Sequence, residues 1–323
     1  MNRRRFLALT ATSVIGIVAA ACAAPAPTPA PAKPAEAPKA VAPAAAAKPA
    51  ASGYVRPELL AETDWLAANL KDPNVRIVDM RTAEKYKVSH IPGAVRYDTG
   101  KLKDPDEKLY VTRPEIFNKD MAALGIGPTT KIVAYDDAGG LGPARFWWAL
   151  DYYGHANTQI LNGGWNKWTK ENRASDTEVP SPAAGSFTAK INPGVICALD
   201  VVQKATDDKS YVIVDARTAG EYSGSDVRAP ATRGGHVPNA VNIDWQKNVT
   251  NDDLKVWKPA NELLKMYEEA GVTKDKKVIT YCQTAVRAAH ALFTLRLLGY
   301  DSVQNYDGSW AEWGNKADTP IQK

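Results

Sequence analysis

Short runs of apolar and β-branched residues recur along the chain, and they predict buried strands. The four clearest are VRIVD at 75–79, KIVAY at 131–135, YVIVD at 211–215 and KVITY at 277–281. Runs of this length without apolar–polar alternation are typical of strands that are covered on both faces. We therefore expect a parallel sheet with both faces buried.

Two longer stretches carry apolar residues at helical spacing. Residues 145–154, RFWWALDYYG, end at Gly154, and residues 287–300, RAAHALFTLRLLGY, contain Gly299 near their end. A glycine at the end of such a pattern is a natural C-cap. Because strands alternate with helices, we predict an α/β fold in which helices cover both faces of a parallel sheet.

The body of the chain, residues 54–323, contains an internal repeat. Four motifs occur twice in the same order: VRIVDMRTAEKY and YVIVDARTAGEY, HIPGAV and HVPNAV, KIVAYD and KVITYC, NGGWNKW and DGSWAEW. The members of each pair stand 136 to 146 residues apart. We therefore predict two domains of the same fold, over 54–171 and 191–323, with a linker over 172–190.

The first 22 residues resemble an export signal. Arg3 and Arg4 precede an apolar run over 8–21 that is too short to span a bilayer comfortably. The arginine pair resembles a twin-arginine signal, and the alanines before Cys22 resemble a lipoprotein cleavage site, at which that cysteine is acylated. Cleavage near Ala21 without lipidation is the alternative.

Residues 23–53 are almost all Ala and Pro with a few Lys, and they lack a helical or strand period. A segment of this composition cannot bury a core. We predict a tether between a membrane anchor at Cys22 and the folded body, which makes the protein a periplasmic or otherwise extracytoplasmic lipoprotein.

The composition of the chain argues against nucleic acids and metal ions as ligands. The net charge of +4 is small, and the body contains no run of Lys and Arg, so no nucleic-acid partner is expected. The three cysteines and four histidines are scattered, without the spacing of a disulfide framework or a zinc site. No metal is therefore expected, and nothing in the sequence implies an organic cofactor.

One cysteine, Cys282, stands where parallel sheets place their ligands, between the predicted strand 277–281 and the helix that begins near Arg287. The turn after it can form an anion cradle from backbone N–H groups; its residues are Gln283, Thr284, Ala285, Val286 and Arg287. The helix dipole and the Arg287 charge favour a nucleophilic thiolate. The cradle would also stabilise a persulfide. An inert core cysteine is the alternative, but a polar turn does not suit it.

Cysteine phosphatases also combine a cysteine, a loop and an arginine, but they space the two residues C-x5-R. Here the spacing is C-x4-R. The shorter turn makes a tighter cradle, which suits one sulfur atom better than a tetrahedral phosphate. Sulfur transfer is therefore the expected chemistry, with phosphatase or arsenate chemistry as the alternative.

The Asp-x-Arg strand ends, the HIPGA turn, the strand that ends in Cys and the late DGS-W turn together resemble the tandem-domain rhodaneses. The resemblance covers 54–320 and includes the connector PSPAAGSFTAKINP at 180–193. It implies two rhodanese-like domains, of which the first is non-catalytic and forms a wall of the active-site cleft. It also implies a thiosulfate sulfurtransferase, in which Cys282 takes sulfane sulfur from a small anionic donor and gives it to a thiophilic acceptor such as cyanide.

The first copy lacks the nucleophile, because Asp136 stands at the place of Cys282. A carboxylate cannot hold a persulfide, and its charge opposes the binding of an anion. Trp147 and Trp148 lie on the helix after this position and are predicted to be core or interface residues. Cys197 is predicted to be a buried small hydrophobic residue.

Two arginines of the second copy are candidates for contact with the donor. The first is Arg217, although the pair Asp215–Arg217 recurs as Asp79–Arg81 in the copy without a nucleophile, which favours a structural ion pair. The second is Arg233, which with Arg228 lies in a segment that the first copy lacks. The family resemblance implies that basic residues of this segment approach the cleft. A solvated loop is the alternative.

The identity of the donor has alternatives. The Arg287 charge favours thiosulfate. The 3-mercaptopyruvate enzymes resemble this chain less, because their loop is neutral and they carry an arginine where this chain has Glu221. A non-enzymatic persulfide carrier in a sulfur relay is the other alternative, because the same loop suits carriage and catalysis equally.

Overall fold

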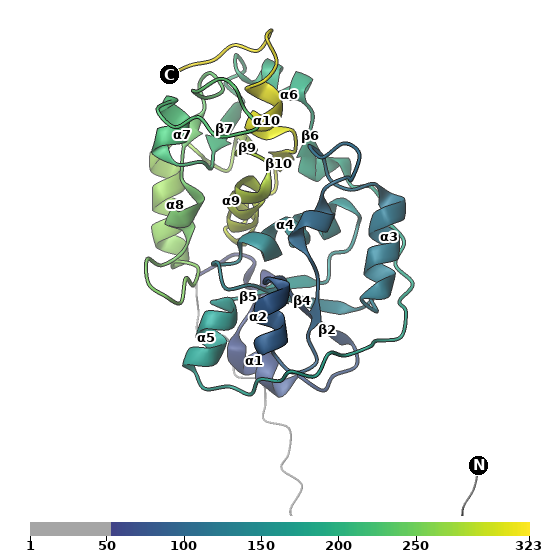
Figure 1. The fold of residues 1–323 in the computed structure, drawn as a ribbon. Coiled ribbons are helices and arrows are strands. Elements are labelled where there is room, and N and C mark those ends of the chain that lie inside the picture. Colours follow the sequence, from purple (N-terminus) through teal and green to yellow (C-terminus); the bar gives the residue numbers. More distant parts are fainter. Residues whose placement is uncertain (1–52) are drawn as a thin grey trace, which may run out of the picture. The chain divides into compact units, whose positions relative to one another are not determined.

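Each half of the chain builds one five-stranded parallel sheet, and Figure 1 shows the two sheets with their helices. The computed structural model describes residues 53–323. The strands of the first sheet lie in the order β1-β5-β4-β2-β3, and those of the second in the order β6-β10-β9-β7-β8. The predicted fold class, two copies of one α/β fold, is confirmed.

The four strands predicted from apolar runs are β2, β4, β7 and β9, with the predicted bounds. The strands are β1 (Leu60–Ala61), β2 (Val75–Asp79), β3 (Val95–Arg96), β4 (Lys131–Tyr135), β5 (Thr158–Leu161), β6 (Ile196–Cys197), β7 (Tyr211–Asp215), β8 (Val241–Asn242), β9 (Lys277–Tyr281) and β10 (Val303–Tyr306). The strands outside the predicted four are short or, in β10, polar in part, so they give little hydrophobic signal.

The helices follow the strands in both halves. They are α1 (Thr63–Ala68), α2 (Ala83–Val88), α3 (Pro114–Ala123), α4 (Leu141–Tyr152), α5 (Gly164–Lys170), α6 (Leu199–Ala205), α7 (Ala219–Ser223), α8 (Ala260–Glu269), α9 (Val286–Leu297) and α10 (Ser309–Trp313). The helix predicted from residue 145 begins earlier, at Leu141. Its first turn holds Gly142 and Pro143, which do not follow an apolar period, although proline is tolerated in a first turn.

Alternate residues of the central strands pack into different cores, which is why both faces of the sheets are apolar. Along β4, Ile132 and Ala134 pack into the core that includes α4, whereas Val133 and Tyr135 pack into the core that includes α5. The former core is shared by the two halves, because α4 and α9 pack against each other in it. Trp147 and Trp148 are both buried there, as predicted.

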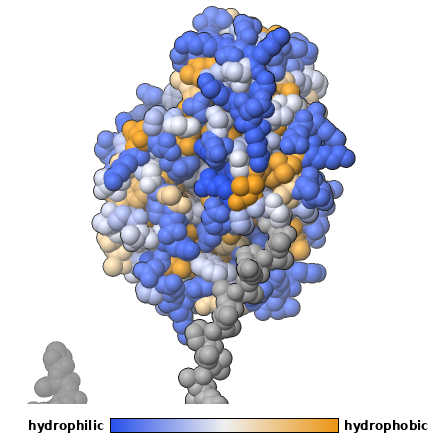
Figure 2. Space-filling model, turned by 180° about the vertical axis from the view of Figure 1, so that it is seen from behind, coloured by the Kyte–Doolittle hydropathy of each residue, from blue (hydrophilic) through white to orange (hydrophobic). Residues whose placement is uncertain are grey.

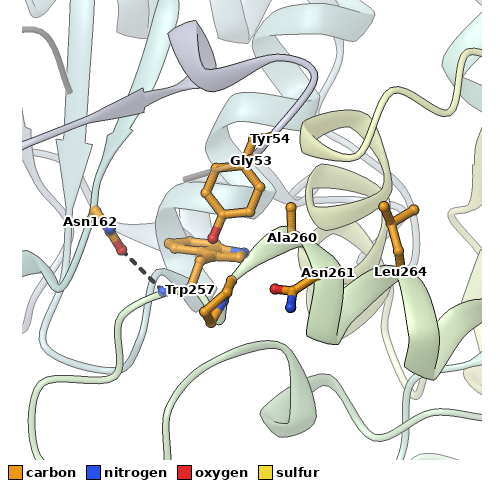
Figure 3. A pocket seen from close by; sticks show the side chains of 8 residues that line it. Gly53, Tyr54, Asn162, Trp257, Ala260, Asn261 and Leu264 are labelled. Atoms are coloured by element: carbon orange, nitrogen blue, oxygen red, sulfur yellow. Dashed lines mark hydrogen bonds between the residues drawn. The ribbon is translucent and has the colours of Figure 1, made fainter. Parts of the chain in front are cut away.

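Each half also sends one loop over the other half. We call residues 97–113 the first crossing loop and residues 243–259 the second crossing loop. In the first, the Val111 N–H donates to Asp307 Oδ2 at 2.6 Å. In the second, the Trp257 N–H donates to Asn162 Oδ1 at 3.0 Å, as Figure 3 shows. The first crossing loop therefore reaches the carboxyl edge of the second sheet, just after β10.

The described surface is polar in the main. Hydrophilic side chains cover most of the face in Figure 2, with smaller hydrophobic patches between them. Across residues 53–323, none of the helices has both the length and the apolar character needed to cross a bilayer. Cys22, the predicted signal over 1–22 and the predicted tether up to residue 52 lie outside the described residues.

Candidate active site

Cys282 lies at the carboxyl edge of the second sheet, directly after β9, and it is buried. Its backbone N–H and carbonyl both form hydrogen bonds with the turn after β10. Its N–H donates to Ser309 Oγ at 3.3 Å, and its carbonyl accepts from the Trp310 N–H at 2.9 Å. The cysteine is therefore held between neighbouring strand ends, where open parallel sheets place their ligands.

The chain passes from Cys282 into α9 through a short loop. Ala285 caps the helix in a left-handed conformation, with φ 63°. The Gln283 side chain attaches the loop to its surroundings, because its Nε2 donates to the Arg228 carbonyl at 2.7 Å. Among the described residues, no acceptor takes the backbone N–H groups of 283–288. These donors, at the positive end of the α9 dipole, are available to an anion.

The corresponding loop of the first half shows what such N–H groups bind. Asp136 follows β4 as Cys282 follows β9. Its Oδ1 accepts the N–H groups of Ala138 at 3.0 Å and Gly140 at 2.8 Å, and its Oδ2 accepts that of Gly142 at 3.0 Å. Burial raises the pKa of Asp136, and the three N–H groups act in the opposite direction. The first loop therefore closes on its own carboxylate.

Arg287 is placed on the first turn of α9, but its charge is not free. Its Nη1 and Nη2 donate to Glu221 Oε2 and Oε1 at 2.7 and 2.8 Å. Burial acts to raise the pKa of Glu221, but the hydrogen bonds and charge of Arg287 outweigh it and lower that pKa to about 2. Arg287 therefore lies where the sequence placed it, in the first turn after the loop, but its charge is shared with the Glu221 carboxylate, a contact that the sequence did not indicate. Its partner comes from α7, which is distant in sequence.

Arg217 does not face a cleft. Its guanidinium pairs with Asp215, with Nη2 2.6 Å from Oδ2, and Nη2 also donates to the Gly235 carbonyl at 2.8 Å. It lies over the ring of Trp310, 4.5 Å from the centroid, and is buried. The structure thus places Arg217 in a buried ion pair that joins two loops, and the first half repeats it with Asp79 and Arg81.

Arg233 is also directed away from the loop. Its guanidinium donates to backbone carbonyls between Trp313 and Thr319, among them that of Gly314 at 3.0 Å. The carbonyls of Trp313 and Gly314 lie at the end of α10, so the side chain acts as a C-cap of that helix rather than as a substrate contact. Arg228 is different, because its half-exposed side chain lies 3.9 Å from Glu221, next to the loop.

Two cations of the first half, which the sequence did not single out, lie beside the turn after β10 that hydrogen bonds to Cys282. Arg145 of α4 is buried, with its Nη1 2.7 Å from Asp307 Oδ1. Lys103 lies on the first crossing loop. Burial lowers its pKa most, Arg145 lowers it further, and the negative charges of Asp307 and Cys282 raise it. A comparison of the two repeats could have identified these residues, since neither cation has a charged counterpart in the second copy.

The model of the rhodanese-like domain matches the chain twice, over residues 62–171 and 198–316. The chain belongs to the rhodanese family. Within this rhodanese, the second match contains Cys282 and its loop, and the first contains Asp136 and both cations.

Individual relatives extend the likeness over both domains. The sulfur carrier protein TtuD of Thermus thermophilus is 39% identical over 285 residues, covering 84% of this chain and 99% of the relative. The thiosulfate sulfurtransferase of Pseudomonas aeruginosa is 34% identical over 267 residues, covering 82% and 97%. The crystal structure of SseA from Escherichia coli, a 3-mercaptopyruvate sulfotransferase, matches with a TM-score of 0.71 and 30% identity, covering 78% of this chain and 98% of that one.

Proposed function

We propose that this rhodanese is a sulfurtransferase that carries sulfane sulfur on Cys282, with thiosulfate as donor. One observation carries the proposal. The loop after Cys282 leaves its N–H groups without acceptors among the described residues, whereas the same loop of the first half uses such groups to hold the Asp136 carboxylate. A cysteine in place of the aspartate has no charge of its own to fill the cradle until it is a thiolate or a persulfide.

The reaction has two steps. In the first, the Cys282 thiolate attacks the outer sulfur of thiosulfate, an S–S bond forms to the enzyme, and the S–S bond of thiosulfate breaks to release sulfite. The two electrons of the broken bond leave with sulfite, so the charge balances at three negative units on each side. In the second, the acceptor, cyanide in the simplest case, attacks the terminal sulfur and leaves as thiocyanate, which regenerates the thiolate.

The N–H groups of 283–288 would stabilise the negative terminal sulfur of the persulfide, as they would any anion at a helix N-terminus. The Arg287–Glu221 pair would hold the first turn of α9 in place and would not contact the sulfur. The family contains both enzymes and a protein named as a sulfur carrier, so the same loop supports either use.

Steady-state kinetics distinguishes these uses. With thiosulfate and cyanide, we expect thiocyanate and sulfite to form in equal amounts over many turnovers, and thiosulfate to give a higher kcat/KM than 3-mercaptopyruvate. A single stoichiometric transfer without turnover would instead identify a carrier. A higher kcat/KM with 3-mercaptopyruvate would contradict the choice of donor, and hydrolysis of aryl phosphates without any sulfur transfer would contradict the proposal as a whole.

We also propose that the protein is exported and anchored to the membrane by a lipid on Cys22. The arginine pair, the short apolar run and the alanines before Cys22 support this. Expression of the full chain should place it in the membrane fraction, and the substitution Cys22→Ala should release it. Membrane association that persists in the variant would contradict lipidation at this residue.

A further inference from the structure

We propose that the first half of the chain binds the anionic group of the donor, through Lys103 of the first crossing loop and Arg145 of α4. The inference rests on the proposed function for the identity of that anion. It gives the domain without a nucleophile a defined part in substrate binding.

The second half commits its nearby guanidinium groups elsewhere. Arg287 is held by the Glu221 carboxylate, Arg217 by the Asp215 carboxylate, and Arg233 by the carbonyls at the end of α10. A dianion approaching Cys282 would meet these charges already neutralised or turned away. Arg228, next to the loop, is paired with Asp226 at 2.8 Å and also lies 3.9 Å from Glu221. Uncommitted positive charge for the donor must then come from the elements that the first half places beside the loop.

Arg145 has hydrogen-bonding capacity to spare. Its side chain is 1% exposed. The guanidinium is stacked on the Trp148 ring, 4.2 Å from the centroid. The Nη1 makes an ion pair with Asp307, 2.7 Å from its Oδ1. Within residues 53–323, its Nε and Nη2 have no hydrogen-bond partner. Buried donors in this state are costly, and an oxyanion with several acceptor oxygens would satisfy them.

Lys103 is brought to the same place by backbone pairing. It forms an antiparallel bridge with Val111, whose N–H donates to Asp307 Oδ2 at 2.6 Å. The Lys103 side chain is only partly exposed. Its Nζ donates to the Lys108 carbonyl of the same loop at 3.3 Å. The charges of Arg145 and Asp307 both act on the pKa of Lys103, so the ammonium lies within electrostatic reach of that buried ion pair.

Asp307 connects these cations to Cys282. It begins the turn after β10 that also contains Ser309 and Trp310, and these two residues hydrogen bond to the Cys282 backbone. The ion pair of Asp307 with Arg145 is therefore built on the turn that holds the nucleophile.

The corresponding positions around the Asp136 loop carry no such charges. Val249 stands where the first half has Lys103, His290 where it has Arg145, and Asn162 where the second half has Asp307. His290 is buried, with its Nε2 3.0 Å from the Gly139 carbonyl, and burial lowers its pKa to about 4, so it is neutral at pH 7. The cations thus occur at the loop with a cysteine and are replaced by uncharged side chains at the loop with a carboxylate.

Direct binding tests the inference without requiring chemistry. Thiosulfate is titrated into full-length protein carrying Cys282→Ala, at low ionic strength, and its Kd is measured by calorimetry. Adding Lys103→Met should weaken binding at least about tenfold, the size of one lost charge-assisted contact. The control is Lys101→Met. Lys101 stands two residues before Lys103, and its exposed side chain is paired with Asp120. Removing this charge should change the Kd less than about twofold.

Arg145 needs a second design, because its removal leaves Asp307 buried and unpaired. The double substitution Arg145→His with Asp307→Asn removes both charges and installs the side chains of the corresponding positions in the other half. Thermal unfolding verifies its fold. It should bind thiosulfate at least about tenfold more weakly than the Cys282→Ala parent.

The outcomes separate this inference from the proposed function. If the parent binds no thiosulfate, or if both designs bind it as tightly as the parent, the inference is overturned even if Cys282 accepts sulfur in the unmodified chain. If Cys282 accepts no sulfur but thiosulfate still binds through Lys103 and Arg145, the result supports the anion site and contradicts the proposed donor reaction.

Discussion

Replacing Cys282 with alanine is expected to reduce thiosulfate-dependent sulfur transfer by at least about a thousandfold, since loss of a covalent nucleophile removes the whole pathway. The side chain is buried at the end of β9, and its sulfur makes no hydrogen bond among the described residues, so the fold should tolerate the change. Thiocyanate formation measures the activity, and thermal unfolding should show a stability change of about 1 kcal/mol.

Cys197 is the matched control. It is also a free and buried cysteine, located on β6 of the same sheet. Burial raises its pKa, so it is a thiol rather than a thiolate at neutral pH. Cys197→Ala should therefore keep wild-type turnover. Substantial activity in Cys282→Ala, or loss of activity in a folded Cys197→Ala protein, would contradict the assignment of the nucleophile.

The second large effect concerns stability. Arg287→Met is expected to lower the free energy of unfolding by about 3 kcal/mol at pH 7, because it leaves the Glu221 carboxylate buried without its partner. Adding Glu221→Gln should recover part of that loss, since the double variant no longer buries an unpaired charge. Chemical denaturation of the wild type, both single variants and the double variant gives the coupling free energy. Strictly additive effects would contradict a direct pair.

The pH dependence of this pair has a defined sign. The pKa of the Glu221 carboxyl is about 2 in the folded state, below its ordinary value of 4.5. Ionised Glu221 therefore contributes stability above pH 4.5. That contribution is lost as the pH falls toward 2. The stability difference between the wild type and Glu221→Gln should therefore be largest near neutral pH and should shrink in acid. A difference that is constant between pH 7 and pH 3 would contradict the shift.

The sequence revealed the fold well because its strongest strands are continuous apolar runs and the whole pattern occurs twice. The position of Cys282 followed from the same pattern, since a residue after a parallel strand lies at the carboxyl edge of the sheet. Contacts between distant segments were not accessible in this way. Arg233 depends on carbonyls near residue 319 and Arg287 depends on Glu221, and no local period marks either contact.

The roles of the two cations of the first half could not be predicted from the sequence either. Lys103 and Arg145 lie in a domain without a nucleophile, so reasoning about each domain alone assigns them no role. The crossing loop and the packing of α4 on α9 bring them to the other sheet. The sequence marks these two residues only when the repeats are compared, because the second copy has the uncharged Val249 and His290 at the corresponding positions.

The measurement that tests the central claim most directly is the mass of the full-length protein after incubation with thiosulfate and removal of the excess. The account predicts a gain of one sulfur atom, located by peptide analysis on Cys282 rather than Cys197 or Cys22, lost on addition of cyanide and absent from Cys282→Ala. A protein with a free Cys282 thiol that gains no sulfur from thiosulfate or 3-mercaptopyruvate would contradict the account.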